Sequence, residues 1–182
     1  MRITKEILWL AEKRIDDIPI LKDSIRGKEA NLIGSIGEVL FEGFIQEEGL
    51  TLEKETREKE KYNHDFVIEG EFTVDVKTKD RSVVPKSNYD CTVAQKTLDH
   101  QDPDYFYFVS LLKKRGVFTD GYLLGAIDTP NLYIRGDTWK EGDIDARNGK
   151  RIRFDCVSIE IKNLIGNDEF INKVQGANGW IM

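Results

Sequence analysis

The sequence predicts a mixed α/β fold, in which a central mixed β-sheet is flanked by helices. Three observations predict this fold class. The chain opens with helix-period apolar patterns, the segment 64–79 alternates apolar and polar residues around a turn, and YFYFVSLL at 105–112 is apolar on both faces. With 182 residues, of which 40% are hydrophobic, the chain can bury one sizeable core, so we expect a single domain over 1–182.

The expected elements follow the order helix, strands, helix, strands. Residues 3–17 have the spacing of an amphipathic helix, and a second helix extends from about Glu29 to Glu48, before a typical capping residue, Gly49. The mixed-charge run 53–61 is interpreted as a solvated strand end or loop. The later expected elements are a β-hairpin at 64–79, a short helix at 92–101, strands at 105–112, 117–127 and 151–162, a loop at 128–150, and a helix near 168–175.

Composition argues against several classes of protein. No stretch approaches the roughly 18 consecutive apolar residues of a membrane span, and the charged, helix-patterned N-terminus is unlike a signal peptide. Cys91 and Cys156 are far apart and lack metal-site spacing, so we interpret them as reduced structural thiols. We therefore expect a cytoplasmic protein with no membrane partner.

Charge is distributed unevenly along the chain. The net charge is −6, yet residues 77–115 hold eight basic and five acidic residues, a balance of +3 that leaves −9 for the remainder. A second basic cluster lies at 147–153. The overall negative charge argues against nonspecific coating of nucleic acid, whereas the local positive surface is compatible with a phosphate-bearing substrate.

The register of the expected hairpin follows from burial. A two-residue loop after Ile68 would mix apolar and polar residues on each face. A three-residue loop instead pairs Ile68 with Phe72. It also pairs Phe66 with Val74, so that five apolar residues share one face, and burial therefore selects this register.

The same register has a chemical consequence on the other face. Asp65 lies directly across from Asp75, and Lys77 follows on that face. Facing carboxylates repel each other, and Mg²⁺ would remove the conflict because it prefers hard oxygen ligands and keeps positions for water and phosphate. Lys77 could then stabilise charge on a phosphate oxygen or orient the attacking water. The alternative is that Lys77 only neutralises an exposed acidic pair.

A second acid-x-Lys triplet occurs at Glu160-Ile161-Lys162. No upstream carboxylate across a tight turn accompanies it, so we interpret it as an ion pair on a strand face.

The second expected helix carries an acid and two glycines that need an explanation. This helix is apolar almost all round, so Glu38 is expected to be a buried carboxylate that needs a partner; the alternative is that it points to water. Gly34 and Gly37 each cost the helix roughly 1 kcal/mol relative to alanine. Close packing against another backbone would explain both glycines.

The short helix expected at 92–101 places Thr92 and Gln95 three residues apart. Gln95 and Lys96 either reach the same site as Lys77 or belong to the polar surface.

These motifs together resemble those of a known family. They are Gly34-Ser35-Ile36-Gly37-Glu38 on a helix, Asp65 before a hairpin turn, Asp75-Val76-Lys77 on the returning strand, and Gln95 on the next helix. Their order and spacing resemble the PD-(D/E)XK nuclease superfamily, which has the restriction-endonuclease-like fold, over roughly residues 30–112. His64 replaces the proline usual before the first acid, a variable position in that superfamily. Restriction enzymes, phage recombination nucleases, junction resolvases and repair nucleases share the core, so the branch stays open.

The resemblance implies a metal-dependent DNA nuclease that hydrolyses phosphodiester bonds. The expected kind is an endonuclease of restriction, phage or repair type, with Mg²⁺ as the cofactor and Mn²⁺ as a substitute. It also implies the site roles: metal ligands at Glu38, Asp65, Asp75 and the backbone carbonyl of Val76, the catalytic lysine at Lys77, and a residue that positions the site or contacts substrate at Gln95.

The DNA partner is expected to lie across the mouth of the site. The side chains expected to contact phosphates are Lys79, Arg81, Lys86 and Lys96. Because one site cuts one strand, cleavage of a duplex needs two protomers, two successive events or a distorted substrate, and we expect a homodimer. Any base readout would come from the loop at 128–150, with Asn131, Arg135 and Trp139.

Three alternatives stay open. His64 and His100 could belong to a histidine-metal nuclease, although in the selected register His64 faces away from Asp65 and His100 lies at a polar helix end. A non-catalytic DNA-binding or assembly module could retain the nuclease fold; the joint presence of three acids and the lysine counts against a decayed site. A carboxylate-metal hydrolase could also act on a substrate other than DNA.

Overall fold

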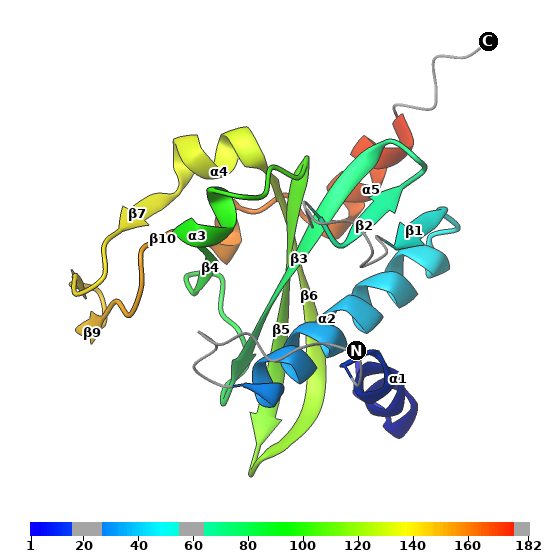
Figure 1. Ribbon diagram of the computed structural model, residues 1–182, viewed down its shortest axis with the longest axis horizontal. Coiled ribbons are helices and arrows are strands. Elements are labelled where there is room, and N and C mark those ends of the chain that lie inside the picture. Colours follow the sequence, from blue (N-terminus) through cyan, green and yellow to red (C-terminus); the bar gives the residue numbers. More distant parts are fainter. Residues whose placement is uncertain (16–26, 55–63, 177–182) are drawn as a thin grey trace.

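The computed structural model describes residues 1–15, 27–54 and 64–176, and its architecture is mixed α/β, as the sequence predicts (Figure 1). A five-stranded sheet with the order β1-β2-β3-β5-β6 forms its centre. Its strands are β1 (Leu52–Lys54), β2 (Phe66–Ile68), β3 (Phe72–Arg81), β5 (Tyr105–Lys114) and β6 (Val117–Asp128). β1, β2 and β3 pair antiparallel, β5 runs parallel to β3, and β6 returns antiparallel to β5.

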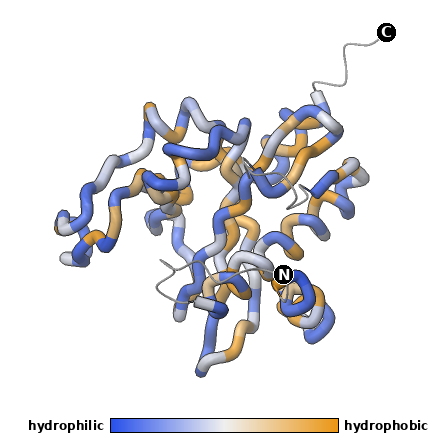
Figure 2. Tube along the Cα trace, viewed as in Figure 1, coloured by the Kyte–Doolittle hydropathy of each residue, from blue (hydrophilic) through white to orange (hydrophobic). Residues whose placement is uncertain are grey.

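Three helices supply the apolar layer on one face of this sheet. They are α1 (Lys5–Ile15), α2 (Lys28–Glu47) and α5 (Asn167–Gly176). Aromatic rings bridge the layers: the ring centroid of Tyr107 on β5 lies 4.6 Å from that of Phe41 and 5.4 Å from that of Phe170. Figure 2 shows hydrophobic residues along the central strands, against which these helices pack. No helix in the described ranges is long and apolar enough to cross a membrane.

Smaller elements cover the opposite face, on the side of the sheet away from α1 and α2 (Figure 1). They are the three-stranded sheet of β4 (Asp90–Ala94), β10 (Cys156–Glu160) and β7 (Asp137–Trp139), the helices α3 (Gln95–Leu98) and α4 (Thr129–Arg135), the 3₁₀-helix η1 (Ile161–Asn163), and the ribbon of β8 (Ile144–Asp145) and β9 (Lys150–Arg151). Phe106 and Phe108 of β5 join Val93 and Val157 in a second apolar cluster on this face.

The two clusters explain the apolar run of β5. Alternate residues of a strand point to opposite faces, so Phe106 and Phe108 enter one cluster while Tyr107 and Val109 enter the other. β5 lies between β3 and β6. The predicted strand at 105–112 is therefore confirmed, and its interior position explains why it is apolar on both faces.

The predicted hairpin register is also confirmed. Ile68 pairs with Phe72 and Phe66 with Val74, which leaves a three-residue loop. Two residues of that loop, Glu69 and Gly70, have positive φ, and the Glu71 N–H donates to the Ile68 carbonyl at 3.0 Å.

The helix predictions hold with changes at the ends. α2 ends at Glu47, and Gly49 has a φ of 74°, the left-handed conformation expected after a helix. α1 is shorter than the predicted 3–17, and residues 16–17 lie outside the described part of the chain. Most of the charged run 53–61 also lies outside it, although Glu53 and Lys54 belong to β1.

Three expectations for the second half of the chain hold only in part; the short helix expected at 92–101 is confirmed only as α3. Residues 92–94 belong to strand β4 rather than to a helix, because Cys91 and Val93 alternate into the second cluster and pair with β10. Within the strand expected at 151–162, only Arg151 (the end of β9) and β10 are strand, and 161–163 form η1. The expected loop 128–150 contains α4, β7 and β8. α4 has a sequence signal that the loop interpretation missed, since Asp128 caps it by accepting from the Asn131 N–H at 2.9 Å.

The two glycines of α2 differ in their surroundings. A Cβ added at Gly37 would lie 2.9 Å from both Cβ and Cγ2 of Thr78 on β3, and closer still to its hydroxyl. Gly37 therefore packs against a side chain of the sheet rather than against backbone. Apart from its own helix backbone, no atom of the described residues lies within 4 Å of a Cβ built at Gly34, so the described part of the chain shows no close packing at that position.

We predict that Gly37→Ala and Gly34→Ala have opposite effects on the free energy of unfolding. Gly37→Ala should destabilise by about 1–3 kcal/mol, because the new methyl group overlaps Thr78. Gly34→Ala should stabilise by up to about 1 kcal/mol through helix propensity. Urea denaturation measures both. Adding Thr78→Ala should recover part of the Gly37→Ala loss, and equal stability of the two single variants would contradict the packing.

Candidate active site

Asp65, Asp75 and Lys77 come together where β2 and β3 pair. Asp65 directly precedes β2 and, in the observed register, lies opposite Asp75. Its N–H donates to the Val74 carbonyl at 3.0 Å. Its Oδ2 accepts from the Val76 N–H at 2.8 Å, which holds the carboxylate against β3. Both carboxylates and the lysine thus occupy one small region at the sheet surface.

The Asp75 carboxylate is buried and forms an ion pair with Lys77. Only 3% of the Asp75 side chain is exposed, against 25% for Lys77. Lys77 Nζ contacts Asp75 Oδ2 and also lies 5.9 Å from the ring centroid of Phe106 on β5. Because Asp75 and Lys77 are two residues apart on a strand, they share a face, which is the face of the second apolar cluster.

The Asp65 carboxyl has a pKa well above its ordinary value. Although the residue as a whole is partly exposed, burial of the carboxyl is the largest cause, and the negative charges of Asp75 and then Glu38 raise the pKa further. Lys77 and the Val76 N–H oppose the shift without cancelling it. Asp65 is therefore close enough to both other acids for their charges to act on its carboxyl.

Glu38 has a partner that the sequence interpretation missed. Its Oε2 accepts from Lys54 Nζ of β1 at 2.8 Å, and 19% of its side chain is exposed. Lys54 of β1 pairs with Phe66 of β2, the residue that follows Asp65 in the chain. Lys54 belongs to the charged run 53–61, whose composition favours a solvated segment, and only the pairing of β1 with β2 brings it to Glu38.

Gln95 and Val76 make other contacts. The Gln95 amide donates to Asp99 Oδ1 at 2.9 Å within α3, and its backbone N–H donates to the Asp155 carbonyl. A role of Gln95 at the site stays a prediction. Val76 is 6% exposed and its N–H serves Asp65, while its carbonyl as a metal ligand also stays a prediction.

The basic residues expected to contact DNA differ in their surroundings. Lys79 is exposed on β3, yet desolvation of its ammonium and the neighbouring Arg81 lower its pKa. Arg81 joins three elements, because Nε donates to Ser110 at 3.1 Å and Nη2 donates to the Asp90 carbonyl at 2.7 Å. Lys86 and Lys96 are exposed, in the segment after β3 and on α3. A cavity of about 30 Å³ lies between β3 and β4, lined by Lys77, Lys79 and Arg81 among others.

The second acid-x-Lys triplet is an ion pair, as predicted. Lys162 Nζ lies 2.6 Å from Glu160 Oε2, although Lys162 belongs to η1 rather than to the strand. Both cysteines are free and buried, and burial raises the pKa of Cys91 to about 12.

No protein-family model matches this sequence, and no curated protein is significantly similar to it.

Asp65 and Asp75 together fit a hard divalent cation, whereas Glu38 does not join them as a third ligand in this structure. Asp75 Oδ2 is buried, and among the described residues its only polar contact is the ion pair with Lys77; the neighbouring Asp65 carboxyl has a raised pKa. Two carboxylates are a donor set that Mg²⁺ accepts, with water in its other positions. Within the described residues, no three His, Cys, Asp or Glu side chains are arranged to hold a metal ion. Glu38 would have to leave Lys54 to join them.

We predict that Asp65 makes the stability of the metal-free protein fall as pH rises. The folded state retains the Asp65 proton above pH 3.8, where the unfolded chain loses it. The contribution of Asp65 to stability is therefore largest below pH 3.8 and is lost as pH rises through the folded pKa of this carboxyl. Unfolding of wild-type and Asp65→Asn protein in EDTA across this pH range measures the difference. Glu71→Gln, an exposed change in the same hairpin, is the control and should retain the wild-type pH dependence. If the difference in stability between wild type and Asp65→Asn does not change with pH, the prediction is wrong.

We predict that Lys77→Met enlarges the stabilisation by Mg²⁺. Without Lys77 the Asp65/Asp75 pair loses its nearest cation, so metal-free stability should drop and the cation-induced rise in Tm should increase. Asp75→Asn should instead relieve repulsion and remove the Mg²⁺ response. Lys162→Met breaks the matched ion pair with Glu160 and should leave the response unchanged. An equal Mg²⁺ shift in Lys77→Met and Asp75→Asn would place the metal elsewhere.

Proposed function

We propose that this protein is a metal-dependent DNA nuclease that hydrolyses phosphodiester bonds, with the endonuclease mode preferred. The observation that carries the proposal is the meeting of Asp65, Asp75 and Lys77 at the β2–β3 pairing. Buried facing carboxylates add nothing to folding, because like charges opposite each other are destabilising. A catalytic use of the pair explains why the chain tolerates them.

The topology supports the restriction-endonuclease-like comparison. The chain order is a helix (α2), three antiparallel strands (β1, β2, β3), strand β4 of the small sheet, a short helix (α3) and a strand parallel to β3 (β5). The acids occupy the helix, the start of the hairpin and the returning strand of this series. Because many chemistries share a fold, the topology supports the proposal only together with the site residues.

Asp65 and Asp75 would hold Mg²⁺, or Mn²⁺ in its place, which supplies Lewis-acid stabilisation of charge on the phosphate oxygens. Lys77 is placed to donate a hydrogen bond to a phosphate oxygen or to the attacking water once its ammonium leaves Asp75. In the hydrolysis, a water oxygen bonds to phosphorus and the bond to one ester oxygen breaks. The products are a phosphate monoester and a free hydroxyl. Phe106 beside Lys77 limits access of water on one side of the ammonium.

The substrate strand would follow the face of β3 that carries Lys77 and Lys79. Lys79 lies on the same face as Lys77, and no acidic side chain forms an ion pair with it among the described residues, so it is suited to a phosphate. Lys86 and Lys96 are exposed beyond it. Arg81 already donates hydrogen bonds to β4 and β5. We therefore propose that it holds β3 in place against these strands as well as contacting DNA. Two protomers, each with one site, would cut the two strands of a duplex.

A non-catalytic DNA-binding or assembly module that retains the fold is the second candidate. The ion pairs of Lys77 with Asp75 and of Lys54 with Glu38 favour it, because both acids are neutralised without any metal.

We predict that the protein cleaves plasmid and linear DNA with Mg²⁺ or Mn²⁺ and not with EDTA. Lys77→Ala and Asp75→Asn should each lower the cleavage rate by roughly 10²- to 10⁴-fold, because each removes a group that acts on the transition state. Lys162→Ala, from the other acid-x-Lys pair, should cleave at the wild-type rate. Binding without cleavage in every metal would favour the non-catalytic module, and wild-type rates in Lys77→Ala would refute the assignment of the site.

A further inference from the structure

A cavity of about 340 Å³ opens on the small sheet, away from the candidate active site. We call it the Trp139 cavity; its lining comprises Asp137, Thr138, Trp139, Asp145, Ala146 and Arg147. β7 supplies one side, and the segment that follows β8 supplies the other. The volume lies in the range of small-molecule sites in proteins.

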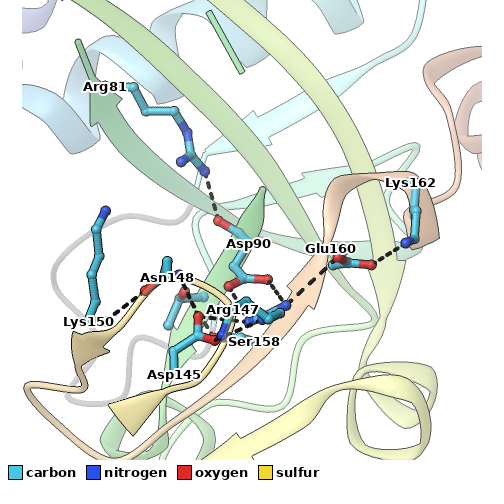
Figure 3. A network of polar contacts seen from close by, with 10 residues as sticks. Arg81, Asp90, Asp145, Arg147, Asn148, Lys150, Ser158, Glu160 and Lys162 are labelled. Carbon is cyan, nitrogen blue, oxygen red and sulfur yellow. Dashed lines mark hydrogen bonds and ion pairs between the residues drawn. The ribbon is translucent and has the colours of Figure 1, made fainter. Parts of the chain in front are cut away.

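Arg147 lines this cavity with its planar cationic group. Figure 3 shows the network of polar contacts around it, with Asp90 and Asp145 close to its guanidinium. Its Nε donates to Asp145 at 3.0 Å, while Nη1 and Nη2 form a fork with the Asp90 carboxylate at 3.1 and 2.7 Å. These hydrogen bonds raise the pKa of Arg147 above its ordinary value. The guanidinium is therefore always charged and held in one orientation, although 41% of the side chain is exposed.

An aromatic wall and an acidic group complete the cavity. The Trp139 ring centroid lies 5.9 Å from Arg147 Cζ. The Asp145 oxygens already accept from Arg147 and Asn148. Asp137 is exposed and has no side-chain hydrogen bond to another described residue, so its carboxylate is the acceptor that the lining offers to a ligand.

The cavity is connected to the strand that carries the candidate active site. Arg81 of β3 donates to the Asp90 carbonyl at 2.7 Å, and the Asp90 side chain holds Arg147 (Figure 3). Lys150 of β9 is close enough to contribute to lowering the pKa of Lys79. Asp75 and Arg81 are six residues apart on β3, about 20 Å, which spans roughly six nucleotide steps of B-form DNA.

We infer that the Trp139 cavity binds one unstacked nucleobase of the substrate strand, several nucleotides from the cleaved bond. This inference rests on the proposed function. The indole and the guanidinium offer planar surfaces on which a base can stack, and such stacking is tolerant of base identity. The Asp137 carboxylate adds a preference, because it accepts from bases with an amino group, such as cytosine or adenine, and has nothing to accept from the O4 edge of thymine.

NMR of the full chain with free nucleosides tests the cavity without any cleavage. The indole N–H signals of Trp9, Trp139 and Trp180 are assigned by single Trp→Phe variants. Millimolar cytidine or adenosine should shift the Trp139 signal and leave the exposed Trp9 signal unchanged, with thymidine weaker. Asp137→Asn should gain response to thymidine, because an amide can donate to O4. No shift of Trp139 with any nucleoside, or equal shifts of Trp9 and Trp139, would overturn the inference.

Binding of single-stranded oligonucleotides then tests the link to the substrate. In an Asp75→Asn background, Trp139→Ala should weaken binding by about 5- to 100-fold, as loss of one stacked base predicts. Trp9→Ala is the matched control and should not change it. An abasic nucleotide moved along the strand should reproduce the loss at one position only. If Trp139→Ala is unfolded, the abasic scan with folded protein carries the test, and a uniform scan overturns the inference.

The two proposals fail in different ways. Nucleoside shifts at Trp139 without DNA cleavage in any metal would leave the base site standing and refute the nuclease. Suppose instead that cleavage depends on Lys77, that nucleosides do not shift the Trp139 signal, and that an abasic nucleotide weakens binding equally at every position. These results would support the nuclease and refute the base site.

Discussion

The antiparallel pairing of β2 with β3 is the constraint on which the rest of the candidate site depends. Phe66, Ile68 and Val74 are fully buried in this register. Each such side chain contributes about 1.5–3 kcal/mol, whereas a facing pair of like charges costs about 0.2–1 kcal/mol at a sheet surface and more when desolvated. Burial therefore holds Asp65 opposite Asp75. A shift by one residue would expose the apolar set and separate the acids.

The charge balance around this pairing is nearly complete without any metal. Glu38, Asp65 and Asp75 face two cations, Lys54 and Lys77, so one negative charge remains when all three acids are ionised. The raised pKa of Asp65 means that a proton can supply the missing charge. A divalent cation that binds there has to displace that proton and loosen the ion pair of Lys77, which gives metal binding both a pH dependence and an electrostatic cost.

The elements after β6 give the protein a second polar centre. Arg147, in the turn between β8 and β9, binds Asp90 of β4. Its Nη1 also lies 3.8 Å from Oε1 of Glu160 on β10. This network neutralises one of the four cations of the basic cluster at 147–153, so the surface there is less positive than the composition indicates. Arg81 connects the same β4 to β3, which couples the position of the small sheet to the strand of Asp75 and Lys77.

Local patterns in the sequence determined the mixed α/β class, α2 with its end before Gly49, the hairpin register, and the buried strand β5. Each follows from interactions within a few residues or from a period that burial imposes. Tertiary structure alone decided three other matters. Residues 92–94 form a strand because β10 pairs with them, Glu38 is neutralised because β1 brings Lys54 to it, and Arg147 has its orientation at the Trp139 cavity because Asp90 binds it. The members of these contacts lie 16 to 66 residues apart in the chain, so no local period or propensity encodes them.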